Sequence, residues 1–146
     1  MDWKKISIER LKDYEKRQRA LESIPEQLDS LNMSFTAVRA ARTDGTPVKD
    51  GSGNKREDAL INNIVMRQEL ERNLGIARAE VSITETGLAV LTEEEKTVLY
   101  KFYTNRPRNH VERLCEDLHL ERSRIYELKE IALRKFTIAC YGIVEL

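Results

Sequence analysis

The chain has 146 residues, of which 40% are hydrophobic and 34% are charged, and its formal net charge is zero. This length suits one domain or two small ones. With only six glycines and three prolines, the composition favours a charge-rich helical protein over a disordered tail or an all-β sandwich.

Three further features of the composition bear on the compartment. No apolar run approaches the roughly 18–20 residues that span a bilayer. The N-terminal sequence MDWKKISIERLKDYEKRQRA has no apolar signal region. The two cysteines, Cys115 and Cys140, are too few for a disulfide framework or a four-ligand zinc site. We therefore expect a cytoplasmic protein with reduced cysteines and no membrane contact.

The first predicted element covers residues 2 to about 31. Its apolar residues recur at steps of mostly three and four, with charges densely placed between them, which is typical of an exposed helix with one buried stripe. The pattern fits one helix, kinked at Pro25, or two helices, the second capped by Ser23. The stripe consists of Trp3, Ile6, Leu11, Tyr14, Leu21, Ile24, Leu28 and Leu31.

Residues 34–56 interrupt this pattern and predict a flexible loop. The stretch TDGTPVKDGSGNK holds two Asp-Gly pairs and a proline. This segment is also basic, with five Lys or Arg against two Asp.

A long helix is predicted from about residue 57 to residue 90. Its core positions alternate steps of three and four residues, which is a heptad pattern typical of a coiled coil. This seam can pack on the N-terminal helix in a helical hairpin or on a second chain, and the pattern does not separate the two. The seam consists of Leu60, Asn63, Arg67, Leu70, Leu74, Ala77, Val81, Thr84, Leu88 and Leu91.

The C-terminal third predicts three helices separated by two breaks. Thr92 with Glu95 forms the Ser/Thr-x-x-Glu pattern of a capping box, and Asn109 with Glu112 is a second candidate for one. The second of these helices spans residues 110–118, the sequence HLER forms a turn, and the last helix spans residues 122–141. Gly142 suits the left-handed residue after a helix end. The chain is therefore predicted to be all-α, with a helical hairpin over 1–91 and a three-helix domain over 92–146.

The last two helices have the spacing of a helix-turn-helix. Cys115 is small enough for a close helix crossing, and Ile125, Leu128, Ala132, Leu133 and Phe136 form the buried stripe of the second helix. In such units the first residues of the second helix reach base edges in the major groove. Arginine can bind guanine bidentately, and polar side chains can hold phosphates. The candidate DNA-contacting residues are Arg122, Ser123, Arg124, Tyr126 and Glu127, with Arg106 and Arg108 as candidate phosphate contacts.

The segments LTEEEKTVLYKFY and HVERLCEDLHLERSRIYELKEIALRKF resemble region 4 of bacterial sigma factors. The whole layout is similar to phage-encoded transcription regulators of the ArpU and RinA type. The detailed match covers about residues 91–142, and the rest matches in layout alone. The resemblance implies binding of double-stranded DNA near promoters and control of phage or prophage genes.

Two positions depart from the pattern of these families. His119 stands where the turn usually has glycine, and His tolerates a left-handed backbone better than bulkier residues do. Glu121 stands where the helix cap is usually Ser or Thr; it favours the helix dipole but would repel a phosphate there. Glu130 adds to this repulsion, and so does Glu127 unless it accepts a hydrogen bond from a cytosine amino group.

The charge of this region is only weakly basic. Residues 105–136 hold eight Lys or Arg against six Asp or Glu. Because neutralisation of phosphates drives DNA affinity, one copy alone should bind weakly. A second linked copy multiplies affinity without new contacts. We therefore expect a homodimer or a factor held by RNA polymerase.

Catalytic and cofactor motifs are absent from the sequence. DGSGN lacks the alternating acidic ligands and final Glu of a calcium loop, and no phosphate-binding loop, zinc-binding helix or nucleophile elbow occurs. We expect no enzyme activity, cofactor or metal. Two alternatives to a transcription regulator remain open: a DNA-packaging adaptor resembling a small terminase subunit, and a protein-interaction module that binds RNA polymerase or a sigma factor.

Overall fold

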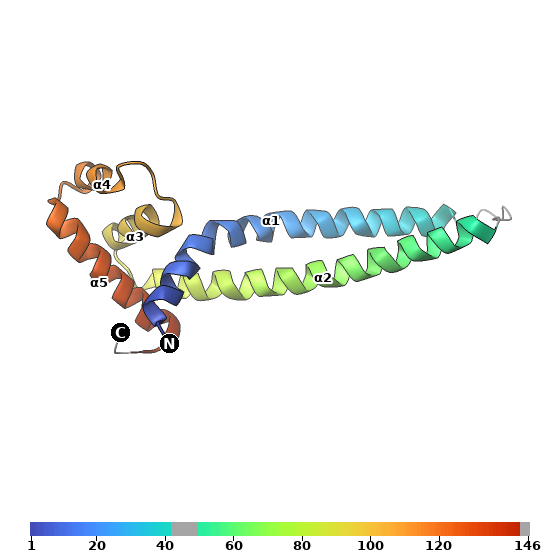
Figure 1. Cartoon of the computed structure of the whole chain (residues 1–146), viewed down its shortest axis with the longest axis horizontal. Helices are drawn as coiled ribbons and strands as arrows, with labels where there is room; N and C mark the ends of the chain where they lie inside the picture. The colour runs from blue at the N-terminus through green and yellow to red at the C-terminus, as the bar shows by residue number, and fades with distance from the viewer. Residues whose placement is uncertain (42–49, 144–146) are drawn as a thin grey trace. The chain divides into compact units, whose positions relative to one another are not determined.

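The computed structural model describes residues 1–41 and 50–143, and this part of the chain is all-α, as predicted (Figure 1). The first two helices form a long hairpin, and shorter helices that pack together follow it. The elements are α1 (Trp3–Ala41), α2 (Asp50–Ala89), α3 (Glu93–Leu99), the π-helical segment η1 (Tyr100–Thr104), α4 (His110–Leu118) and α5 (Arg122–Tyr141).

Helix α1 is continuous through Pro25, so the alternative of two helices is not realised. A proline inside a helix removes one backbone hydrogen bond and costs about 3 kcal/mol. The neighbouring Ile24 is buried. We infer that burial of the apolar stripe against α2 holds the helix together across this residue.

The loop predicted over 34–56 is wrong at both of its ends. Helix α1 continues to Ala41 and α2 already begins at Asp50, while residues 42–49 lie outside the described part of the chain. Phe35 explains the extension of α1, because the Arg67 guanidinium of α2 lies 4.7 Å from the centre of its ring. This contact with the partner helix continues the buried stripe past the point where the local composition turns polar.

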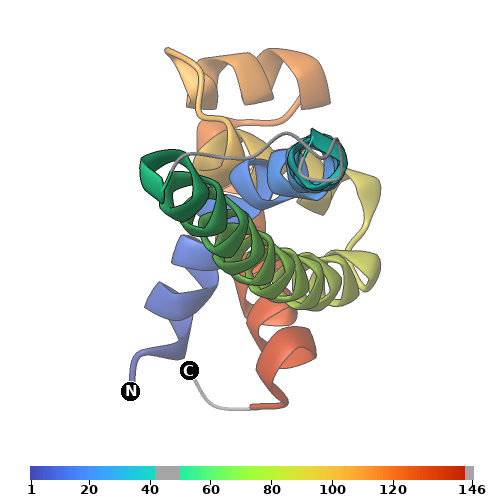
Figure 2. The ribbon, with the colours of Figure 1, turned by 90° about the vertical axis from the view of Figure 1, so that its right-hand side faces the viewer.

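Residues 19–78 form one compact unit, made of the second part of α1 and the first part of α2. In Figure 2 its two helices lie side by side. The heptad seam faces α1 of the same chain: the Asn63 side-chain amide donates to the Leu31 carbonyl (2.8 Å), and Leu74 and Ala77 are buried. The seam therefore packs within the chain, which decides between the two arrangements that the pattern left open.

Residues 1–18 and 79–146 form the second compact unit. One apolar cluster joins Leu11 of α1 to Leu99 of α3 and Phe136 of α5, and a second joins α3 and η1 to α4 and α5. The Ser7 and Thr137 hydroxyls, both buried, lie 2.8 Å apart. The first turns of α1 thus belong to the core that supports the C-terminal helices; a domain boundary at residues 91/92 stays a prediction.

The predicted capping box at the start of α3 is confirmed. The Thr92 hydroxyl accepts from the Glu95 amide (3.2 Å), and the Glu95 carboxylate accepts from the Thr92 amide (3.1 Å) and from Lys135 of α5 (3.1 Å). Burial alone would raise the pKa of Glu95, but the Thr92 amide and the Lys135 ammonium outweigh it, and the pKa lies below its ordinary value. The carboxylate thus links the start of α3 to α5.

We expect Glu95→Gln to lower the free energy of unfolding at pH 7 by about 1 kcal/mol, since a charged acceptor is lost. A folded-state pKa below the unfolded value of about 4.3 gives stability that is present above that pH and lost as the pH falls. Urea unfolding of wild type and variant should therefore differ at pH 7, and the difference should shrink as the pH falls below about 4.3. Glu94→Gln, at the exposed neighbouring position, is the control, and equal stability of wild type and Glu95→Gln at pH 7 would contradict the expectation.

Candidate nucleic-acid interface

Helices α4 and α5 are joined by a three-residue turn and form the predicted helix-turn-helix, with the predicted helix bounds. His119 has the left-handed conformation that the turn requires (φ 55°, ψ 42°). Its amide and that of Leu120 both donate to the Cys115 carbonyl. His119 thus takes the backbone conformation for which glycine is usual.

The entrance to α4 differs from the prediction. Asn109 was expected to form a capping box with Glu112, but its backbone is left-handed (φ 55°, ψ 42°) and its side chain makes no cap hydrogen bond. Asn tolerates this conformation better than most residues do, and the tight turn before α4 takes advantage of that tolerance. The start of α5 also lacks a side-chain cap, because Glu121 stands at that position.

The predicted stripe of α5 is buried, and the candidate DNA-contacting residues on its first turns are exposed. Because the buried stripe covers one side of the helix, the exposed residues share the other side. That side continues past the predicted residues to Glu130, Ile131 and Arg134, all exposed. Ile131 was not among the predicted residues. Its position four residues after Glu127, on the same side of the helix, was the signal that could have added it. The predicted exposed residues are Arg122, Ser123, Arg124, Tyr126 and Glu127.

Arg106 and Arg108 lie in the loop before α4, and both are exposed. The Arg106 Nε donates to His110 Nδ1 (3.3 Å). Burial, and the charges of Arg106 and Arg122 acting against that of Glu112, lower the pKa of His110. Arg106 and Arg122 therefore both lie near the His110 imidazole. No described contact joins Arg108 to this group.

Arg122 and Arg124 are both paired with carboxylates. Arg122 Nη1 lies 3.0 Å from Glu112 Oε1 of α4, and its guanidinium lies 6.0 Å from the centre of the Tyr126 ring. Arg124 Nη1 lies 3.1 Å from Glu127 Oε2. These pairs hold each guanidinium in place and offset its charge. Both are exposed pairs, which contribute little to stability.

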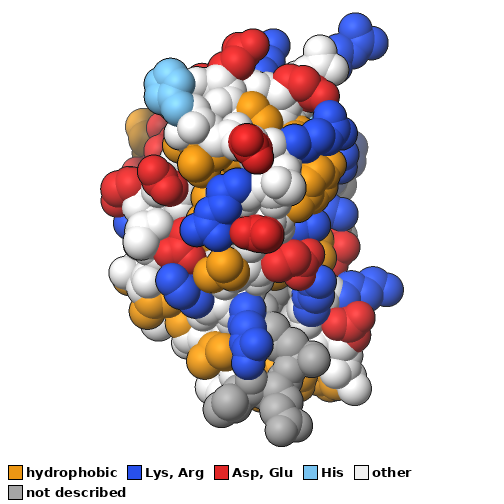
Figure 3. Space-filling model, turned by 90° about the vertical axis from the view of Figure 1, so that its left-hand side faces the viewer, with side chains coloured by type: hydrophobic (Ala, Val, Ile, Leu, Met, Phe, Trp, Pro, Cys, Tyr) orange, Lys and Arg blue, Asp and Glu red, His pale blue; other side chains and the backbone are white. Residues whose placement is uncertain are grey.

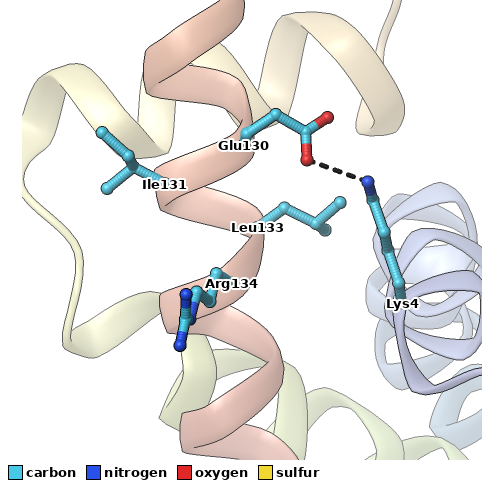
Figure 4. A pocket seen from close by; sticks show the side chains of 5 residues that line it. All are labelled: Lys4, Glu130, Ile131, Leu133 and Arg134. Atoms are coloured by element: carbon cyan, nitrogen blue, oxygen red, sulfur yellow. Dashed lines mark hydrogen bonds and ion pairs between the residues drawn. The ribbon is translucent and has the colours of Figure 1, made fainter. Parts of the chain in front are cut away.

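The charges on this side of the protein are mixed. In Figure 3, acidic and basic side chains alternate over the face, with hydrophobic atoms between them. Beside α5, Lys4 of α1 donates to Glu130 (2.8 Å; Figure 4). Lys129 lies 3.1 Å from the same carboxylate. The Lys4 hydrogen bond is the main cause that lowers the pKa of Glu130, with burial opposing it and Lys129 assisting. The carboxylates on this face thus carry neighbouring cations.

Burial raises the pKa of the Cys140 thiol to about 11. A thiol with so high a pKa is a poor nucleophile and metal ligand at neutral pH.

Within residues 1–41 and 50–143, no helix is long and apolar enough to cross a bilayer, and no group of three or more His, Cys, Asp or Glu side chains could hold a metal ion.

Comparisons with protein families, with curated proteins and with solved structures find no match for this chain.

Proposed function

We propose that the protein is a DNA-binding transcription regulator of phage or prophage genes that acts at promoters through α4 and α5. The observation that carries this proposal is the exposed side of α5, the helix that follows a turn in which the His119 backbone is left-handed. It presents arginine, hydroxyl and carboxylate groups, which are the side chains that read base edges and hold phosphates. The role is one of binding, without catalysis or a cofactor.

The pairing of Arg122 and Arg124 with carboxylates supports weak binding by one copy. Every cation that is already neutralised releases fewer counterions when it meets a phosphate. We therefore propose that two copies act together, or that RNA polymerase holds the protein at the promoter. Because the heptad seam packs within the chain, a dimer must use another surface.

We propose that a second copy packs on the outward side of α2 in the unit of residues 19–78. Ile61, Val65 and Ile76 are 57%, 51% and 48% exposed there. Ile61 and Ile76 lie at equal distances from the midpoint between Gln68 and Glu69. An antiparallel second copy would therefore place Ile61 on the partner's Ile76 and Val65 on the partner's Arg72. This two-fold match favours a second copy as the occupant.

Ile61→Glu should shift the protein from dimer to monomer in sedimentation equilibrium, because it places a carboxylate against the partner's Ile76. Gln27→Glu, at an exposed site of α1 in the same unit, adds the same charge and should leave the dimer unchanged. A wild-type protein that is monomeric at tens of micromolar would rule this interface out. A closed ring of many copies would favour the DNA-packaging adaptor.

Selection from a random duplex library tests the proposed function. The full-length protein is incubated with the library at low and at near-physiological salt, and the retained duplexes are sequenced. An enriched motif is the expected result, with inverted half-sites if a dimer binds. Absence of enrichment at both salts would overturn autonomous DNA reading and favour the protein-interaction module, whose binding to RNA polymerase or a sigma factor could be measured directly.

A further inference from the structure

The exposed side of α5 has a shallow hollow along the first half of the helix. It is lined by Ser123, Tyr126, Glu127, Glu130 and Ile131 and has a volume of about 460 Å³. These positions are spaced three, four, seven and eight residues apart, so they share one side of a single helix. The shape of the hollow is therefore set by α5 itself.

Two large apolar side chains stand at the edges of this hollow. Tyr126 is 39% exposed and Ile131 is 41% exposed. Figure 4 shows Ile131 pointing away from Lys4, while Glu130 points toward it. Ile131 is therefore available to a molecule that approaches the exposed side of α5.

The acidic residues of the hollow are compensated by cations. Glu127 is paired with Arg124 (3.1 Å), and Glu130 is paired with Lys4 (2.8 Å) and Lys129 (3.1 Å). With both carboxylates neutralised in this way, repulsion of a polyanion is weakened. The hollow is thus an apolar surface within a set of paired charges.

We propose that this hollow receives the 5-methyl group of a thymine in the major groove, with Ile131 as the contacting side chain. The inference rests on the proposed function. The thymine methyl is the apolar group among the base edges of the major groove, and apolar side chains recognise it by contact. Ile131 therefore adds a preference for thymine at one position to the base preferences set by the polar residues of α5.

Uracil substitution tests this contact, because deoxyuridine differs from thymidine only by the methyl group. The best duplex from the library selection is remade with single thymine-to-uracil replacements, and binding is measured by fluorescence anisotropy. One position should lose about fourfold in affinity, which corresponds to one buried methyl group of about 0.8 kcal/mol. Ile131→Ala should bind the thymine and uracil duplexes with equal affinity. That affinity should match the affinity of wild type for the uracil duplex.

Val90→Ala is the matched control, because Val90 is also an exposed apolar residue, 55% exposed, but lies outside the hollow. It should keep the wild-type preference for thymine. Retained duplexes that show no uracil effect, or an effect that survives in Ile131→Ala, would overturn the thymine contact and leave DNA binding intact. Failure to retain any duplex would overturn the proposed function and this inference with it.

Discussion

Gly87→Ala is expected to destabilise the unit of residues 1–18 and 79–146 by about 2 kcal/mol. A Cβ atom at Gly87 would lie 2.7 Å from two carbons of the Phe136 ring and would also collide with Cys140 Sγ. Phe136 is fully buried, so its ring cannot move aside without disturbing the core between α2 and α5. Because alanine favours a helix over glycine by about 1 kcal/mol, the steric cost must exceed that gain.

Trp3 makes this unfolding easy to follow. It is the single tryptophan of the chain, and its ring lies 5.0 Å from the ring of Tyr141 at the end of α5. Urea unfolding followed by tryptophan fluorescence therefore reports on this unit. A midpoint for Gly87→Ala at or above that of wild type would show that α2 and α5 do not approach so closely.

Gly75→Ala is the matched control in the same helix. A Cβ atom at Gly75 would meet no atom within 4 Å. Helix propensity should then act alone, and this variant should be more stable than wild type by about 0.5–1 kcal/mol. Because Gly75 lies in the unit of residues 19–78, both variants are also followed by far-ultraviolet circular dichroism, which reports on the helices of both units. Opposite signs for the two substitutions would separate the effect of packing from that of propensity.

Local signals in the sequence predicted the bounds of α4 and α5, although the capping box expected at Asn109 is not formed. The left-handed backbone of Gly142 was predicted from its place after the helix end, and that of His119 from the turn of the resembled families, where glycine is usual. These features depend on interactions within a few residues of chain. The same holds for the exposure of Arg122 and Arg124, since the buried stripe leaves the other side of α5 open.

Contacts between distant residues were beyond the sequence. Ser7 and Thr137 are 130 residues apart, and neither has a feature that names its partner. The extension of α1 to Ala41 depends on Arg67 of another helix, and local composition indicated a loop instead. The pair between Glu112 and Arg122 likewise arises only when α4 and α5 cross. The charge compensation of the candidate interface is therefore a result of tertiary structure.

The double variant Arg122→Ala/Arg124→Ala should lose DNA affinity by one to two orders of magnitude. A good bidentate arginine–guanine contact contributes about 1–3 kcal/mol to discrimination against the wrong base. The Glu112 and Glu127 carboxylates, which lie 3.0 and 3.1 Å from the two guanidinium groups, compete with the DNA for them. We therefore expect less than the sum of two full contacts.

Affinity and sequence preference together distinguish base reading from simple charge. Wild type and variant are titrated against the selected duplex and a scrambled one at several salt concentrations. Loss of base contacts should abolish the preference between the duplexes, whereas loss of phosphate contacts weakens both equally and reduces the salt slope by about one per contact. Lys16→Ala/Arg39→Ala removes the same charge from exposed sites on α1 and should keep the preference. An Arg122→Ala/Arg124→Ala variant that still selects the wild-type motif would show that α5 does not read bases through these two residues.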